Sequence, residues 1–258
     1  MTYNLTFLGT CAANFSKKLQ NECRDCFDKD ARRASCVLFN ERFLIDCGPH
    51  ALDSMRIAGV NPGQITDLFL THLHDDHFNP DNVQTVASAA QRPLRVWVSA
   101  DAKMPPLENV VIMPMEPRTT LTVNDELTVT GLAANHAPES YPQHLLFERE
   151  GKKFLYSCDG GWFLNPSFNY LRKSGLALWV VDATCGDYEG DFRMADHNSI
   201  PMIRLMLPSM RTIGAINDDT QVYLSHIAPS LHKSHDETVE IVKPSGLHVA
   251  YDGLVLSV

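Results

Sequence analysis

Apolar positions along the chain fall mainly into short runs, and only a few stretches repeat at the helical period. The short runs predict strands at residues 3–9, 35–39, 42–45, 65–70, 94–98, in several segments of 110–135, and at 144–148, 152–157, 176–181, 221–224 and within 248–258. The helical patterns predict helices at residues 49–58, 79–91, 163–174, 198–210 and 237–243. Strands interspersed with helices imply a layered α/β structure. This density of short strands favours an αββα sandwich, with two packed mixed sheets and the helices outside, although other α/β layouts share the pattern. No composition break marks a linker, so we expect a single domain over residues 1–258.

A cluster of metal-ligand side chains follows the predicted strand at residues 65–70. Residues 71–77 read THLHDDH and contain His72, His74, Asp76 and His77. Imidazole and carboxylate groups are the ligand types that suit Zn²⁺, Mn²⁺ and iron. His72 and His74 are two residues apart, so an extended backbone points both the same way. Asp76 and His77 form a second group, which suits a second ion close to the first.

Further ligand-type residues stand where other predicted strands end. His136, Asp159 and His226 each follow an apolar strand, on loops that a rigid sheet can position. Any one of them alone would more often be a surface or hydrogen-bonded residue. Together with the histidine cluster they predict the remaining ligands of two metal ions. Asp182 ends another strand and is predicted to orient a ligand histidine from outside the metal site.

Composition and charge narrow the classes of function. The chain is 44% hydrophobic and 21% charged, which is typical of globular proteins in solution. No apolar run approaches the roughly 18 residues that span a bilayer, and no signal peptide is evident, so we expect a cytoplasmic protein without membrane contact. The seven cysteines form an odd set, which favours reduced thiols or a metal site over a disulfide framework. The net charge of −9 argues against a long nucleic acid as partner. A small anionic substrate is still allowed, because divalent ions would dominate the local field.

These motifs resemble those of the metallo-β-lactamase-fold hydrolases. The His-x-His-x-Asp-His motif of that superfamily matches residues 72–77, and its later motifs match His136, Asp159 and His226 in order and context. The resemblance implies a dinuclear centre of two divalent ions, zinc or manganese. One ion would take His72, His74 and His136, the other Asp76, His77 and His226, and Asp159 would bridge them.

Within the superfamily, the chain is most similar to the PhnP branch of phosphodiesterases. The likeness rests on chain length, on Cys23 and Cys26 in the long first loop, and on His197, which matches a histidine that assists phosphate-ester cleavage in that branch. It implies hydrolysis of a cyclic or nucleotide phosphodiester. The branch also holds a structural zinc with a third cysteine and a later histidine. Asn21 and Pro229 stand at those positions here, so the zinc is lost or His232 helps to replace the missing ligands.

The resemblance also suggests a mechanism. A hydroxide held between two metals is a nucleophile near neutral pH, Asp159 can accept or orient its proton, and His197 is the expected acid or phosphate donor. The expected partners are a small anionic phosphodiester and, in a homodimer, a second copy of the chain.

Three alternatives for the function stay open. A tRNA 3′-processing hydrolase would need a basic RNA-binding arm that the sequence lacks; a lactonase or esterase shares Asp76 as a ligand; and a metal-dependent binding protein would keep the ligands without turnover.

Overall fold

The computed structural model describes residues 3–13, 15–16, 18–19, 23 and 25–258. Within these residues the strands form two mixed sheets. The first sheet has the order β14-β1-β2-β3-β4-β5-β6, with β1 (Asn4–Gly9), β2 (Cys36–Phe39), β3 (Phe43–Ile45), β4 (Asp67–Phe69), β5 (Leu94–Ser99), β6 (Val110–Met115) and β14 (Val255–Ser257). The second has the order β13-β12-β11-β10-β9-β8-β7, with β7 (Thr120–Thr122), β8 (Leu127–Ala133), β9 (Gln143–Arg149), β10 (Lys152–Ser157), β11 (Leu178–Asp182), β12 (Gln221–Ser225) and β13 (His248–Val249).

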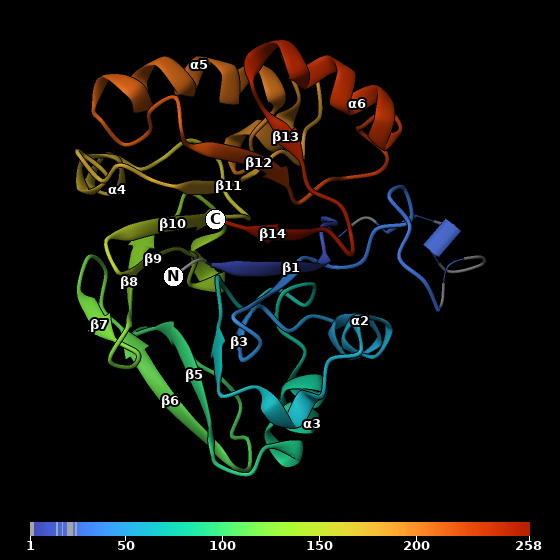
Figure 1. Cartoon of the computed structure of the whole chain (residues 1–258), viewed down its shortest axis with the longest axis vertical. Helices are drawn as coiled ribbons and strands as arrows, with labels where there is room; N and C mark the ends of the chain where they lie inside the picture. Colours follow the sequence, from blue (N-terminus) through green and yellow to red (C-terminus); the bar gives the residue numbers. More distant parts are fainter. Residues whose placement is uncertain (1–2, 14, 17, 20–22, 24) are drawn as a thin grey trace.

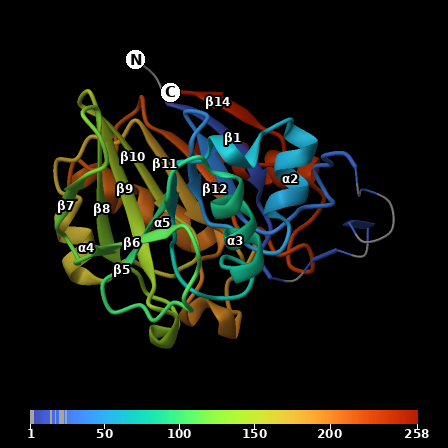
Figure 2. The same cartoon turned by 90° about the horizontal axis from the view of Figure 1, so that it is seen from below.

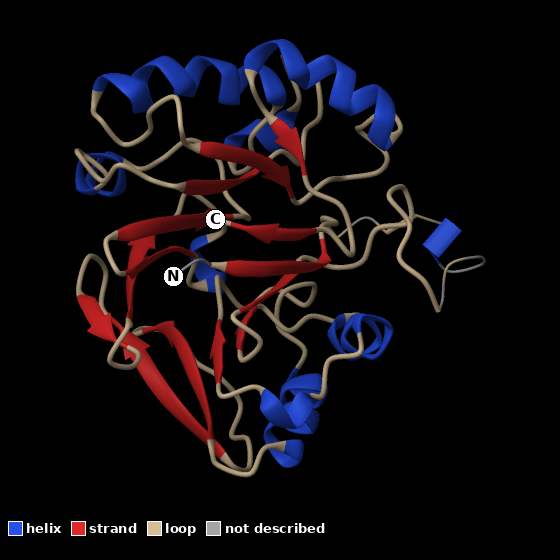
Figure 3. Ribbon diagram, in the orientation of Figure 1, coloured by secondary structure: helices blue, strands red, loops and turns tan. Residues whose placement is uncertain are grey.

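The helices cover the outer faces of the two sheets. Figure 3 shows the helices outside the stacked strands, and Figure 1 shows α4, α5 and α6 over the second sheet and α2 and α3 over the first. The described helices are α2 (Ala51–Ala58), α3 (Pro80–Ala89), α4 (Asn165–Tyr170), α5 (Ile200–Thr212) and α6 (His235–Val242), with short 3₁₀ turns η1 (Pro62–Gln64), η2 (Pro138–Ser140), η3 (Phe192–Ala195) and η4 (Lys243–Ser245). The predicted αββα sandwich is therefore confirmed.

Three apolar clusters hold these layers together. The cluster between the sheets is rich in aromatic rings, with Phe39 and Phe147 at 4.9 Å and Phe69 stacked on Trp97 at 5.7 Å between ring centroids. A second cluster joins the second sheet to α5 and α6, and a third joins the first sheet to α2 and α3. Because each sheet buries both faces, its strands read as continuous apolar runs in the sequence.

Both sheets change from antiparallel to parallel pairing halfway across. In the first sheet, β3, β4, β5 and β6 are parallel to one another, and in the second sheet β10, β11, β12 and β13 are parallel. The first and last strands, β1 and β14, lie side by side at one edge in both views (Figures 1 and 2). In open parallel sheets, ligand sites form at the carboxyl ends of the strands. The parallel halves therefore define where the functional side chains lie.

Element boundaries differ from the sequence prediction mainly around the fourth helix. A helix was expected over 163–174, but α4 is shorter and covers Asn165–Tyr170. The chain turns soon afterwards, where Lys173 and Gly175 have positive φ angles of 59° and 58°. The left-handed conformation of Lys173 could not be predicted from the sequence, because glycine and asparagine are the residues that usually adopt it.

Candidate metal centre

The predicted ligands all follow the carboxyl ends of strands. His72, His74, Asp76 and His77 lie on the loop after β4, and His136, Asp159 and His226 lie on the loops after β8, β10 and β12. The structure brings the seven side chains together in two groups that share one carboxylate. In each group, one ligand atom from each residue lies within 4.8 Å of the others.

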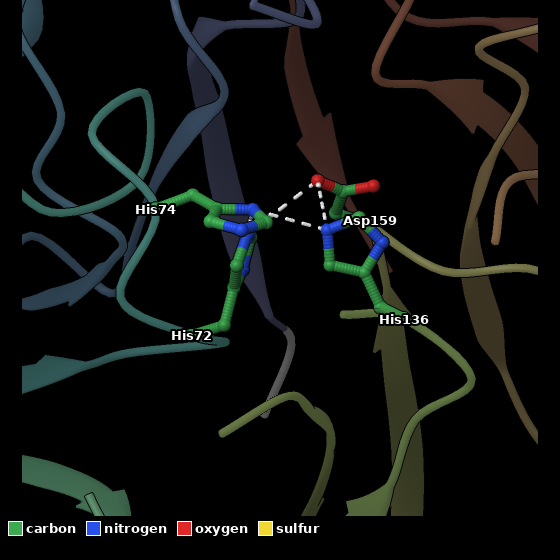
Figure 4. A group of neighbouring side chains, drawn as sticks. All are labelled: His72, His74, His136 and Asp159. Carbon is green, nitrogen blue, oxygen red and sulfur yellow. Dashed lines mark hydrogen bonds and ion pairs between the residues drawn. The ribbon is translucent and has the colours of Figure 1, made fainter. Parts of the chain in front are cut away.

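The first group contains His72, His74, His136 and Asp159 (Figure 4). Nδ1 of His74 lies 3.0 Å from Nε2 of His72 and 3.1 Å from Nε2 of His136. Oδ2 of Asp159 lies 3.5 Å from Nε2 of His72 and 3.4 Å from Nε2 of His136. The three rings and the carboxylate point toward one another, as Figure 4 shows.

The second group contains Asp76, His77, His226 and the same Asp159. Nε2 of His77 lies 3.1 Å from Nε2 of His226 and 3.4 Å from Oδ2 of Asp76. Oδ2 of Asp159 lies 3.7 Å from Nε2 of His77 and 3.5 Å from Nε2 of His226. One oxygen of Asp159 therefore faces both groups, in the place where a bridging ligand would lie.

Hydrogen bonds at the far side of the rings fix which nitrogen faces the centre. Nδ1 of His77 donates to Oδ2 of Asp46 at 2.7 Å, and Nδ1 of His226 donates to Oγ1 of Thr184 at 2.7 Å, with Oδ2 of Asp182 3.1 Å away. Nδ1 of His136 donates to the backbone carbonyl of Asp196 at 3.3 Å. A neutral imidazole carries one proton, so the opposite nitrogens turn bare lone pairs toward the centre.

This donor set fits a divalent cation. Bare nitrogens 3.0–3.1 Å apart repel each other unless a positive charge lies between them. Ligands at about 2.0–2.1 Å from a tetrahedral Zn²⁺ are separated by about 3.3 Å. The separations of 3.0 to 3.7 Å in the two groups bracket that value. The chemistry of the residues therefore suits metal ions, as their spacing in the sequence predicts, and their roles as ligands stay predictions.

Buried carboxylates make the centre strongly attractive to positive charge. Burial lowers the pKa of His226, but the carboxylates of Asp159 and Asp182 outweigh it and raise that pKa to about 9. Burial also acts against the ionised form of Asp159, yet the surrounding imidazoles hold the pKa of this carboxyl well below its usual range. Without a metal, protons on the ring nitrogens satisfy this demand, and a bound divalent cation would displace them and use the lone pairs.

Two positions of the centre have backbone conformations that ordinary residues avoid. Asp46 and His226 have positive φ angles of 59° and 55°, which cost about 1–3 kcal/mol each for residues other than glycine. Asp46 follows β3 and His226 follows β12, so both turns place a side chain directly at a strand end. Strain of this kind gathers at functional sites, where the surrounding structure holds it in place.

His197 lies beside the second group. Its Nδ1 is 2.8 Å from Oδ1 of Asp159 and 3.2 Å from Oδ2 of Asp182. Burial lowers the pKa of His197, but its hydrogen bonds to these two carboxylates raise that pKa to about 11. The ring is 15% exposed, so it links the interior of the site to solvent. The predicted helix behind it begins at Ile200 with Ser199 as its N-cap.

Asp182 accepts hydrogen bonds from several directions at the end of β11. Thr184 Oγ1 donates to Oδ2 at 2.8 Å, and the backbone N–H of Asn198 donates to Oδ1 at 2.8 Å. The carboxylate is fully buried between the rings of His197 and His226. This placement agrees with the orienting role that the sequence predicts for it.

Several residues that hold the predicted ligands in place were not predicted from the sequence. Asp46 and Thr71 support His77, Thr184 supports His226, and the carbonyl of Asp196 supports His136. Asp46 carried a usable signal, because it ends the strand at Phe43–Ile45 just as Asp182 ends β11. The backbone carbonyl of Asp196 carried none, since every residue has one.

The cysteine pair does not gather a complete set of ligands. Cys23 is buried and Cys26 is exposed, and across the described residues neither of them belongs to a group of three or more metal-ligating side chains. Nε2 of His232 instead donates to the backbone carbonyl of Ala183 at 2.6 Å. Asn21 lies outside the described residues. The pair at Cys23 and Cys26 therefore gives no support to a structural zinc.

The family follows from comparison with known proteins. Residues 41–227 match the model of the beta-lactamase superfamily domain, which is well over half of the chain, so the chain belongs to the beta-lactamase superfamily. The predicted metallo-β-lactamase fold is thereby confirmed. Among the described residues, no helix combines the length and the apolar character that crossing a membrane requires.

Particular solved structures share the fold over its full extent. The metallo-β-lactamase fold protein YhfI from Bacillus subtilis superposes with a TM-score of 0.76 at 16% identity, covering 100% of this chain and 99% of that one. A diphosphatase from the PhnP family gives a TM-score of 0.73 at 16% identity, with 100% and 98% coverage. Human tRNase Z, short form, gives 0.68 at 17% identity, with 98% coverage of both chains.

Curated relatives match over a smaller part. Ribonuclease Z of Methanothermobacter thermautotrophicus is 36% identical over 96 residues, which are 36% of this chain and 28% of that protein. Human zinc phosphodiesterase ELAC protein 1 is 35% identical over 81 residues, 30% of this chain and 19% of that protein. The matched part therefore spans less than a third of these relatives.

Proposed function

We propose that the chain is a metal-dependent phosphodiesterase that hydrolyses a small cyclic or nucleotide phosphodiester. The observation that carries the proposal is the pair of ligand groups sharing Oδ2 of Asp159. Two such groups fit two divalent ions, and an in-line displacement at phosphorus uses two ions to hold the attacking and leaving oxygens. Curated relatives named ribonuclease Z and zinc phosphodiesterase support phosphodiesters as the substrate class.

The first ion would be held by His72, His74 and His136, and the second by Asp76, His77 and His226, with Asp159 shared. Zinc and manganese both suit this mixture of imidazole and carboxylate. When bound, such ions lower the pKa of water to about 7 and neutralise charge on phosphate oxygens.

The chain's own residues orient the proton that the reaction must move. Nδ1 of His197 is engaged by Asp159 and Asp182, so its Nε2 is the atom left to face a substrate. In the metal-free chain the two carboxylates raise the pKa of this ring to about 11, and Asp182, which is not a predicted ligand, still faces Nδ1 when ions are bound. His197 is thereby suited to donate to a leaving oxygen or to a phosphoryl oxygen. Asp182 also holds Nδ1 of His226, so it couples the orientation of the acid to that of a ligand.

A second candidate function is tRNA 3′-processing, because several curated relatives are named ribonuclease Z. A long RNA requires a basic surface, whereas this chain has 22 Lys and Arg against 31 Asp and Glu. This balance favours a small substrate, and we propose that the chain takes no long nucleic acid as a partner.

The test is hydrolysis by metal-free protein reconstituted with Mn²⁺ or Zn²⁺. We expect cleavage of bis-p-nitrophenyl phosphate and of 2′,3′-cyclic nucleotides, which His74→Ala abolishes and a chelator prevents. A precursor tRNA is offered in parallel. Cleavage of the tRNA alone would favour the second candidate, and no cleavage of any phosphodiester with both ions bound would refute the proposal.

A further inference from the structure

His144, at the start of β9, is a buried imidazole that the metal centre does not use directly. It is 1% exposed, and neither Nδ1 nor Nε2 has a hydrogen-bond partner in the described parts of the chain. The ring of Phe163 lies edge-on against it, with ring centroids 5.2 Å apart. A buried polar group without a partner destabilises a fold. An apolar side chain of similar size would therefore suit the packing better.

The polar edge of His144 faces the loop that carries Asp159. A Cβ built on Gly160 would lie 2.9 Å from Cε1 of His144. Cε1 is the ring carbon between the two nitrogens, so this edge of the ring faces Gly160, although neither nitrogen is hydrogen-bonded within the described residues. The absence of a side chain at Gly160 is what lets the imidazole approach the peptide that follows Asp159.

Two asparagines also hold this loop. Nδ2 of Asn198 donates to the carbonyl of Gly160 at 2.8 Å, and the N–H of Gly161 donates to the carbonyl of Asn135 at 2.9 Å. Asn198 directly follows His197 and Asn135 directly precedes His136. The loop is thus held by the segments of two site histidines and also packs against the ring of His144.

We propose that His144 is a positioning residue that supports the Asp159–Gly160 peptide and so holds the shared carboxylate between the two ligand groups. This inference rests on the dinuclear centre proposed above. Burial lowers the pKa of His144 to about 4, so the ring is neutral and offers one N–H and one lone pair. A peptide also has one donor and one acceptor, which lets the ring follow the loop when Asp159 engages an ion. An apolar side chain offers neither group.

The experiment compares His144→Leu with His144→Gln, which keeps a donor and an acceptor. Leu146→Met is the matched control, because Leu146 is buried on the same face of β9 and its volume is nearly conserved. The measurements are the melting temperature of the metal-free protein, and the stoichiometry and affinity for added Zn²⁺ or Mn²⁺ by calorimetry and elemental analysis.

We expect metal-free His144→Leu to melt at or above the temperature of the parent protein. It should nevertheless bind at least one of the ions about 10- to 100-fold more weakly, the range found when groups that orient ligands are removed. His144→Gln should recover part of the affinity, and Leu146→Met should bind as the parent does. A merely structural histidine cannot combine unchanged or higher stability with weaker metal binding.

Two results would overturn the inference. One is parental affinity for both ions in His144→Leu; the other is equal loss of affinity in His144→Gln and His144→Leu with both melting well below the parent. The proposed function is tested by a separate measurement. A parent protein that binds two ions but cleaves no phosphodiester refutes that function, and the comparison of metal affinities among the variants still tests the role of His144.

Discussion

Replacing Asp46 with asparagine tests how the second ion is held. The carboxylate is fully buried, and both of its oxygens are acceptors. Oδ1 accepts from the backbone N–H of Thr71 at 2.8 Å, and Oδ2 accepts from Nδ1 of His77 at 2.7 Å. An asparagine of the same shape has one acceptor and one donor. In either orientation, the amide N–H group of the asparagine would face another N–H group, either the backbone N–H of Thr71 or Nδ1–H of His77.

The consequence for metal binding follows from the tautomer of His77. Asp46 keeps the proton on Nδ1, so that Nε2 carries the lone pair that would bind the ion. Loss of such an outer partner typically weakens metal affinity 10- to 100-fold, which is about 1.4–2.7 kcal/mol. The first ion should be affected less, because Asp46 contacts His77 directly but reaches His72 only through Oγ1 of Thr71. We therefore expect Asp46→Asn to retain one tightly bound ion and to bind the other weakly.

The assay is stepwise titration of metal-free protein with Zn²⁺, followed by calorimetry. Asp67→Asn is the matched control. Asp67 is equally buried in the neighbouring strand β4, where Oδ1 accepts from Nε1 of Trp97 at 2.7 Å and Oδ2 accepts from Arg95 at 2.9 Å. Both variants should unfold at lower temperature, and only Asp46→Asn should lose the second ion. Parental affinity for two ions in Asp46→Asn would refute the reasoning.

Three further predictions concern the acid, the shared ligand and the half-buried His232. His197→Ala should lower kcat about 10²- to 10⁴-fold with metal content unchanged; loss of metal would show that His197 is a ligand instead. Asp159→Ala should reduce the occupancy of both ions in elemental analysis, and full occupancy of either would contradict its shared position. Burial lowers the pKa of His232 to about 4, so folding disfavours its protonation and stability falls as the pH drops below 6.5. Between pH 7 and 5 this loss is about 2 kcal/mol, and urea unfolding of His232→Gln should lack it.

The sequence predicted the ligands because they obey two strong rules. A tight cluster such as residues 71–77 has no common structural explanation, and strand ends are where a sheet positions side chains. His136, Asp159 and His226 satisfied the second rule, and the structure places all three beside the cluster. The αββα layers were predictable for a related reason, since alternation of short strands and helices leaves few ways to bury both faces of a sheet.

The supporting interactions were less predictable because they depend on distances between loops. Thr71 and Thr184 look like ordinary hydroxyl residues in the sequence, yet they contact His72 and His226 at 3.0 Å and 2.7 Å. The role of His144 is hidden for the same reason, because it depends on a close approach of Gly160 from a different strand connection. Sequence spacing carries no information on such approaches until the sheet order is known.

The sheet order also explains why one carboxylate can serve both groups of ligands. Strand β10 is the point in the second sheet where pairing changes from antiparallel with β9 to parallel with β11. The loop after β10 therefore lies between the loop after β8, which carries His136, and the loop after β12, which carries His226. A carboxylate at that position reaches toward both histidines without any extension of the chain. Moving Asp159 to the end of β11 would bring it toward His226 and away from His136, so the position of β10 midway between β8 and β12 is the feature of the fold that permits a shared ligand.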